Sequence, residues 1–134
     1  MYHKAITETI GNAIWDNGKA FLVDLHGFDQ EKNETRTQER KSDLIIGSCG
    51  EKTIQTNSHL DERLCEKLSN YGYIAHIATA NGFLSGGYTI LHHATTHKIN
   101  ALQIGISGKY RAKDATEEGQ KLAKALAKCL SELV

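Results

Sequence analysis

Apolar runs of strand length alternate with amphipathic segments along this chain. The runs cover residues 20–26, 44–48, 73–78 and 101–107, and glycine or polar residues follow each of them. Apolar residues recur at helical spacing over residues 2–15, 58–71 and 88–93, and again from residue 114 to the end. Strands with nearly continuous apolar sequences are typical of a sheet covered by helices. We therefore predict one α/β domain over residues 1–134, with a largely parallel or mixed sheet of about four strands sandwiched by helices.

Capping patterns mark the predicted starts of two of these helices. Ser58 is followed three residues later by Asp61, and Asp114 is followed in the same way by Glu117, so both pairs approximate a capping box. Between the first two strands, residues 29–41 are polar throughout and carry charges of both signs. We interpret this stretch as a solvated surface loop, with a mobile lid as the alternative.

The charge balance argues against several classes of partner. The chain has 16 Lys and Arg residues against 16 Asp and Glu, and its formal net charge is +0. We therefore expect no nucleic acid and no anionic membrane held by long-range electrostatics. No stretch approaches the roughly 18–20 apolar residues of a membrane span, and the amino terminus lacks a signal-peptide pattern. The three cysteines form no CxxC pair, which predicts reduced thiols and a cytoplasmic protein.

The first candidate for chemistry lies where the earliest apolar run ends. The run AFLVDLH has the composition of a buried strand, and it stops at His26 and Gly27. Asp24 and His26 are two residues apart, so on a strand both side chains lie on the same face. Open α/β sheets place ligands and reacting groups at the carboxyl ends of their strands. We therefore consider His26 a candidate metal ligand or base, with a hydrogen-bonded structural histidine as the alternative.

A second histidine pattern is less favourable for metal binding. His93 and His97 are four residues apart, which is the spacing of two ligands on one face of a helix. The segment between them, Ala94-Thr95-Thr96, is a weak helix former because of its two threonines, and the glutamate of an HExxH site is missing. His3 lies near the start of the first predicted helix, where we expect a surface or capping contact.

Three segments taken together carry a resemblance to a known family. They are YHKAI at residues 2–6, VDLHGF at 23–28, and GGYTILHHAT followed by NALQIGIS and YR over residues 86–111. In this order the segments resemble the N-formylglutamate amidohydrolase family, which belongs to the wider group of zinc carboxypeptidase-like hydrolases. The resemblance implies a part of the phosphorylase/hydrolase-like (zinc exopeptidase) fold. It covers residues 2–111 and corresponds to the carboxyl-terminal half of the family's chain.

The resemblance also implies a site. His26 would be one ligand of a catalytic Zn²⁺ ion, which polarises the substrate carbonyl and lowers the pKa of a bound water to about 7. A glutamate on a late strand would take the water's proton and pass it to the leaving nitrogen. Gly86, Gly87 and Tyr88 would line the pocket, and the substrate would be a small amide or amino-acid derivative.

Two departures from the family pattern change this expectation. The two other zinc ligands of the family lie in an upstream segment that has no counterpart in this sequence. The late strand contains Gln103-Ile104-Gly105, so glycine replaces the glutamate base and is expected to leave room beside the strand. We therefore predict a catalytically impaired relative with an incomplete zinc site.

Two other interpretations remain open. The first is an α/β binding or assembly module without metal. The second is a zinc hydrolase whose site is completed by a partner chain or a second copy, which would join His26 to His92, His93 or His97 of another chain. If the upstream segment contributes strands in the relatives, the sheet here has an exposed edge, which predicts a homo-oligomer.

Overall fold

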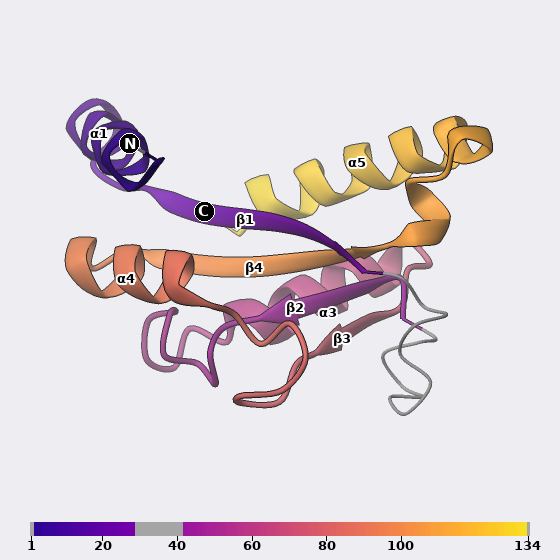
Figure 1. Cartoon of the computed structure of the whole chain (residues 1–134), viewed down its shortest axis with the longest axis horizontal. Helices are drawn as coiled ribbons and strands as arrows, with labels where there is room; N and C mark the ends of the chain where they lie inside the picture. The colour runs from indigo at the N-terminus through magenta and orange to yellow at the C-terminus, as the bar shows by residue number, and fades with distance from the viewer. Residues whose placement is uncertain (1, 29–41, 134) are drawn as a thin grey trace.

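A mixed four-stranded sheet organises the molecule (Figure 1). The computed structural model describes residues 2–28 and 42–133 of the chain. The elements in chain order are α1 (Tyr2–Asn17), β1 (Phe21–Phe28), β2 (Leu44–Gly47), α3 (Leu60–Asn70), β3 (Ala75–Ile77), α4 (Tyr88–His97), β4 (Asn100–Ser107), the 3₁₀ turns η2 (Gly108–Tyr110) and η3 (Lys113–Ala115), and α5 (Thr116–Ser131).

The strands are ordered β1-β4-β2-β3 across the sheet. β1 runs parallel to β4 with Phe21 opposite Asn100, and β2 runs parallel to β3. β2 and β4 are antiparallel, with Leu44 opposite Ile106. The carboxyl ends of β1 and β4 therefore lie at the same end of the strands as the first residue of β2. The predicted α/β fold with a mixed sheet of four strands is confirmed.

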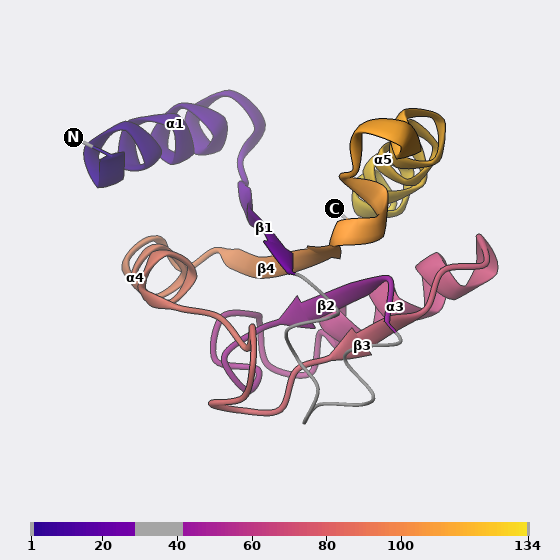
Figure 2. The same cartoon turned by 45° about the vertical axis from the view of Figure 1, so that its right-hand side comes forward.

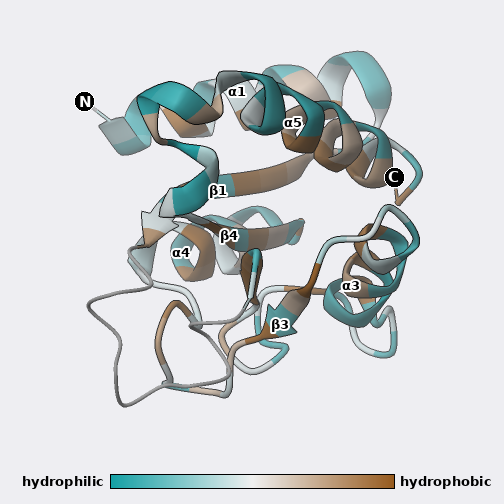
Figure 3. Ribbon diagram, turned by 90° about the vertical axis from the view of Figure 1, so that its right-hand side faces the viewer, coloured by the Kyte–Doolittle hydropathy of each residue, from teal (hydrophilic) through white to brown (hydrophobic). Residues whose placement is uncertain are grey.

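Helices cover both faces of this sheet (Figure 2). α3 and α5 lie on one face, which we call the α5 face, and α4 lies on the other, the α4 face. The main core lies on the α5 face, where brown hydrophobic segments of the strands and of α5 approach one another (Figure 3). It consists mainly of aliphatic side chains from β2, β4, α3 and α5, including Leu44, Ile46, Leu64, Leu68, Leu102, Ile104, Leu122 and Leu126.

The first two elements, which we call the amino-terminal limb (residues 2–28), are packed far less closely. α1 lies beside α4 and away from α5 (Figure 2), and Ile10 is the one buried residue of this helix. Trp15 is 89% exposed. β1 is an edge strand, and the expectation of a buried strand is wrong: residues 21–24 are half-buried, residues 25–27 are exposed, and Phe28 is its one buried residue. The reason is that β1 has a neighbour on one side only among the described residues.

Both predicted capping boxes are wrong. α3 begins at Leu60, and its N-cap His59 has a left-handed backbone (φ 52°). The Asp61 carboxylate instead accepts hydrogen bonds from the Ser48 hydroxyl at 2.9 Å and from the backbone N–H of Glu62 at 2.9 Å. η3 precedes α5, whose N-cap Ala115 makes no side-chain capping bond. A tertiary contact of Asp61 and the 3₁₀ turn before α5 therefore take the place of the predicted capping hydrogen bonds.

Two further predictions concern regions outside these elements. The stretch predicted as a solvated loop or lid, residues 29–41, lies outside the described part of the chain. Among the helices that the structure describes, none is long and apolar enough to span a bilayer.

Candidate functional site

The predicted zinc ligand His26 lies near the carboxyl end of β1. Its Nε2 is 3.0 Å from Oδ2 of Asp24, so the two side chains share the α4 face, as the alternation of strand residues predicts. The imidazole side chain is 44% exposed and the aspartate side chain is 19% exposed. A carboxylate that holds one nitrogen of a histidine is a common way to orient the other nitrogen toward a metal. The pair supplies two groups, whereas catalytic zinc needs three protein ligands.

Arg111 connects the ends of β1 and β4. Its Nη2 donates to the carbonyl oxygen of Phe28 at 3.1 Å, and its Nε donates to the carbonyl oxygen of Ile106 at 3.3 Å. The guanidinium lies directly over Gly27, where an added Cβ would come within 2.5 Å of the Arg111 Cζ atom. Gly27 therefore permits a close approach that holds the two strand ends together.

Asp43 accepts most of the polar contacts at this end of the strands, where β2 begins and β4 ends. Its buried carboxylate accepts the backbone N–H of Ile74 at 2.7 Å and the hydroxyl of Tyr110 at 2.8 Å, and it lies 2.6 Å from Nζ of Lys109. Burial alone would raise the pKa of Asp43, but the bonds from Lys109, Ile74 and Tyr110 outweigh it and hold the pKa below its usual value. These bonds fix the turn after β4 to the start of β2, which is a structural role.

Apolar side chains pack against the position of the missing base. Gly105 lies opposite His26 on β1 and opposite Ile45 on β2. A Cβ at this glycine would come within 2.5 Å of Cδ1 of Leu84 and 3.3 Å of Cδ1 of Phe28. Leu84 reaches this place from a loop, in a left-handed backbone conformation (φ 58°). The expected room beside Gly105 is therefore filled by apolar side chains.

The predicted pocket residues Gly86, Gly87 and Tyr88 follow this loop into α4. Gly86 has a φ of 124°, and an added Cβ there would meet Cδ1 of Ile90 at 2.5 Å, so glycine is required. Gly87 is the N-cap of α4. The Tyr88 ring is 65% exposed and stacks on His92 at 5.0 Å. These residues lie on the same face of the sheet as Leu84, and the contacts of the Tyr88 ring are with imidazoles of α1 and α4.

Four histidines gather where α1 meets α4. His93 is fully buried, and its Nε2 lies 3.1 Å from Nδ1 of His3. Its ring also stacks against His97 at 5.6 Å and contacts His92 at 4.9 Å. The Nδ1 atom of His93 is buried and has no hydrogen-bond partner among the described residues. Only a neutral ring fits this place, since a protonated one would carry an N–H on both nitrogens.

This arrangement corrects two expectations. His3 does not make a simple surface or capping contact, because it is the polar partner of a buried histidine. His93 has no exposed surface, so it cannot join His26 of another chain at a shared metal. Burial lowers the pKa of His93, and the neighbouring rings of His92, His3 and His97 lower it further.

A group with metal-ligand chemistry lies elsewhere, at the start of α3. One ligand atom from each of Glu51, His59 and Glu62 lies within 4.8 Å of the others, and all three residues are exposed. Nδ1 of His59 is 3.4 Å from Oε2 of Glu62. One imidazole and two carboxylates form a donor set that suits zinc.

Comparison with known proteins identifies the family. The sequence model for N-formylglutamate amidohydrolase matches residues 1–110 of the chain. The chain belongs to the N-formylglutamate amidohydrolase family. It is also similar to the crystal structure of N-formylglutamate amidohydrolase from Ralstonia eutropha JMP134, with a TM-score of 0.71 and 20% sequence identity. The match covers 96% of this chain and 47% of that one, so this chain spans about half the length of the solved relative. No curated protein matches the chain.

The zinc ion implied by the resemblance to N-formylglutamate amidohydrolases does not fit the residues at His26. Among the described residues, Glu51, His59 and Glu62 form the one group of three close metal ligands, and His26 is not part of it. Asp24 is the partner of His26, and the adjoining position on β4 is closed by Leu84 over Gly105. We therefore derive no catalytic step through a metal at this edge.

Proposed function

We propose that this chain is a catalytically impaired member of its family. It keeps the fold and a surface for a small amide or amino-acid derivative, and it lacks the groups that hydrolyse an amide bond. The observation that carries this proposal is the apolar contact at Gly105. A general base must lie within hydrogen-bond reach of the water that it deprotonates, and here the methyl group of Leu84 and the ring of Phe28 take up the place beside the strand.

The ligand surface in this proposal contains Gly86, Gly87 and Tyr88. Two features support it: the Tyr88 ring is largely exposed, and a Cβ added at Gly87 would meet nothing within 4 Å, so the backbone is accessible there. A ligand that stacks on Tyr88 and bonds to the N-terminal N–H groups of α4 would fit this surface. Calorimetric titration with N-formylglutamate, the compound in the family's name, tests this ligand surface. The wild type is compared with Tyr88→Ala. We expect weaker binding in the variant.

Metal content and hydrolysis test the impairment. Zinc per chain is measured by elemental analysis on protein purified without chelators or a histidine tag, for the wild type, His26→Ala and His59→Ala. We expect His26→Ala to match the wild type, and any bound zinc to be lost in His59→Ala, because the close ligand group includes His59. We also expect no formate release from N-formylglutamate.

The opposite result has a clear meaning. Near-stoichiometric zinc that is lost in His26→Ala, together with formate release, would contradict the impairment. It would favour a hydrolase whose remaining ligands come from another chain.

A further inference from the structure

The outer edge of β1 is the most accessible edge of the sheet. β1 has eight residues and stands at the end of the strand order, so among the described residues its outer backbone groups have no partner strand. The opposite edge belongs to β3, which has three residues. Long open edges pair readily with other chains, whereas very short edge strands are a common protection against such pairing.

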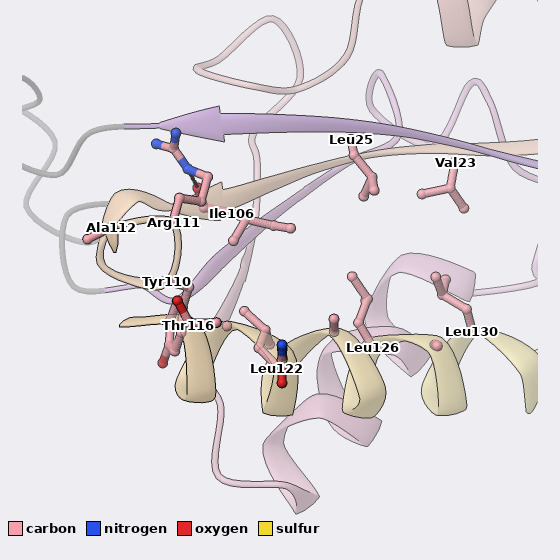
Figure 4. Close-up of a pocket in the computed structure, with 14 residues that line it drawn as sticks. Val23, Leu25, Ile106, Tyr110, Arg111, Ala112, Thr116, Leu122, Leu126 and Leu130 are labelled. Atoms are coloured by element: carbon pink, nitrogen blue, oxygen red, sulfur yellow. Dashed lines mark hydrogen bonds between the residues drawn. The ribbon is translucent and has the colours of Figure 1, made fainter. Parts of the chain in front are cut away.

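An apolar groove of about 640 Å³ opens beside this edge on the α5 face (Figure 4). Val23 and Leu25 of β1 line it from one side, and Leu122, Leu126 and Leu130 of α5 line it from the other. Leu25 is 58% exposed. It is continuous with the other apolar side chains of the groove, and contiguous exposed apolar patches mark interaction sites more often than single exposed leucines do.

A second apolar hollow adjoins the same strand on its α4 face. It measures about 300 Å³ and lies between α1 and the start of β1, with Ile6, Ile10, Phe21 and Leu22 in its lining. A small molecule would fill one hollow. A β-strand, whose side chains alternate between the two faces, would occupy both and would also pair with the open backbone.

We propose that a second copy of this chain pairs with β1, antiparallel and about a two-fold axis at Leu25. In this register Asp24 of each copy lies opposite His26 of the other copy on the α4 face, so the pair occurs twice. On the α5 face, Leu25 lies opposite the Leu25 of the second copy. An isologous contact requires such self-complementarity, because each patch meets itself. The sequence Asp24-Leu25-His26 provides it, with an acid and an imidazole placed symmetrically about one exposed leucine.

Neighbouring registers are poorer. A shift by one residue would turn the polar face of one strand toward the apolar face of the other. Shifts by two would place Asp24 opposite Asp24, or His26 opposite His26, and would lose both unlike pairs. The proposed register also continues the sheet from four strands to eight and places the two α5 grooves side by side.

The first test is the mass of the full chain in solution, measured by sedimentation equilibrium across the micromolar range. We expect a dimer for the wild type and at least about tenfold weaker association for Leu25→Lys, because the substitution places two ammonium groups at the axis. Ile74→Lys is the matched control, because Ile74 is 60% exposed and precedes β3 at the other edge. We expect this variant to dimerise like the wild type. Circular dichroism checks that each variant is folded.

A charge-exchange experiment tests the register. His26→Asp alone makes both cross-strand pairs acidic, and Asp24→Lys combined with His26→Lys makes both basic. Each protein is expected to associate at least about tenfold more weakly than the wild type, and an equimolar mixture is expected to form the heterodimer. The mixture also guards against misfolding as an explanation, since an unfolded variant would not be rescued by its counterpart.

Several outcomes overturn the proposal. A monomeric mass at every concentration would show that β1 does not pair with a second copy, and would leave another polypeptide or no partner at this edge. A wild-type dimer that Leu25→Lys leaves intact would place the contact elsewhere. Acidic and basic variants that associate alone as well as they do together would refute the register.

Discussion

The amino-terminal limb and the rest of the molecule contribute to the same sheet in different ways. In residues 42–133, which we call the closed half, Leu44, Leu64 and Leu102 have no exposed surface, and α3 and α5 pack directly on the strands. In the limb, Ile10 and Phe28 are the buried apolar residues. The limb is held by the pairing of β1 with β4 and by the contact between His3 and His93.

The closed half therefore provides most of the buried core, whereas the limb leaves apolar surface accessible. Apolar burial in the closed half is sufficient for an ordinary core, whereas the limb has an apolar hollow on each face of its strand and an open edge. Within the described residues both hollows remain open. The following changes test the contrast, from the largest expected effect to the smallest.

Truncation of a core leucine should cost far more than truncation in the limb. We expect Leu64→Ala to lower the free energy of unfolding by about 3 kcal/mol, because it leaves a cavity in a fully buried site. Ile14→Ala in α1, where the side chain is 36% exposed, should change it by no more than about 0.5 kcal/mol. Urea unfolding measures both. Equal losses would show that the limb is part of the core.

Introduction of the missing base should disrupt the closed half. We expect Gly105→Glu to lower the free energy of unfolding by about 2 kcal/mol, because the added side chain would have to displace Leu84 and pack against Phe28. Adding Leu84→Ala to the same chain should recover part of the loss by making room. Thermal unfolding measures both variants. A stable Gly105→Glu protein would mean that the position is more open than these contacts imply.

Loss of the carboxylate at Asp43 should have an effect of similar size. We expect Asp43→Asn to lower the free energy of unfolding by about 2 kcal/mol at pH 7, because charge-assisted bonds from Lys109, Tyr110 and Ile74 are weakened. The pKa of Asp43 is depressed in the folded state. Its stabilisation is therefore complete above the unfolded pKa of about 3.9 and is lost as the pH falls through the lower folded value.

Urea unfolding at pH 7 and in the acid range measures this contribution. Lys109→Met is the control, because it removes only the exposed partner and should cost less than about 1 kcal/mol. If Asp43→Asn kept the full acid sensitivity of the wild type, the carboxylate would not be the group responsible.

The polar contact of the limb should respond to milder acid. The pKa of His93 is lowered in the folded state, so the unfolded chain binds this proton first. Stability is therefore complete above about pH 6.5 and declines as the pH falls below it toward the folded value. Urea unfolding between pH 7.5 and 5.5 should show the decline in the wild type and a smaller one in His93→Leu. His59→Ala, which changes an exposed imidazole, should retain it.

The sequence was informative wherever burial and periodicity agree. The four apolar runs contain the four strands, and the helical spacing of apolar residues after residue 114 corresponds to α5, whose buried residues are Leu122, Ala125, Leu126 and Cys129. α4 extends past its predicted end to His97, although Thr95 and Thr96 are weak helix formers, because Ile90 and Ala94 pack against Ala101 of β4 and offset the propensity.

The rest depends on contacts that no local pattern encodes. That β1 lies at an edge follows from the order in which strands pair. His3 and His93 meet across 90 positions of the chain. Leu84 covers Gly105 because its backbone is left-handed, which its residue type does not suggest. Ser58 does not cap α3, because the helix begins one residue later with His59 at its N-cap, and Asp61 bonds to the distant Ser48 instead. The family resemblance singled out Gly105 and could not predict that Leu84 and Phe28 pack against it.

The pairing of β1 with β4 also has a consequence for biosynthesis. Phe21 lies opposite Asn100, so β1 leaves the ribosome long before its partner strand has been translated. During that interval an apolar strand with both edges free is exposed to proteases and to other nascent chains. A ribosome that pauses before residue 100 therefore prolongs this interval, and the demand for chaperones during synthesis should depend on the speed of translation between β1 and β4.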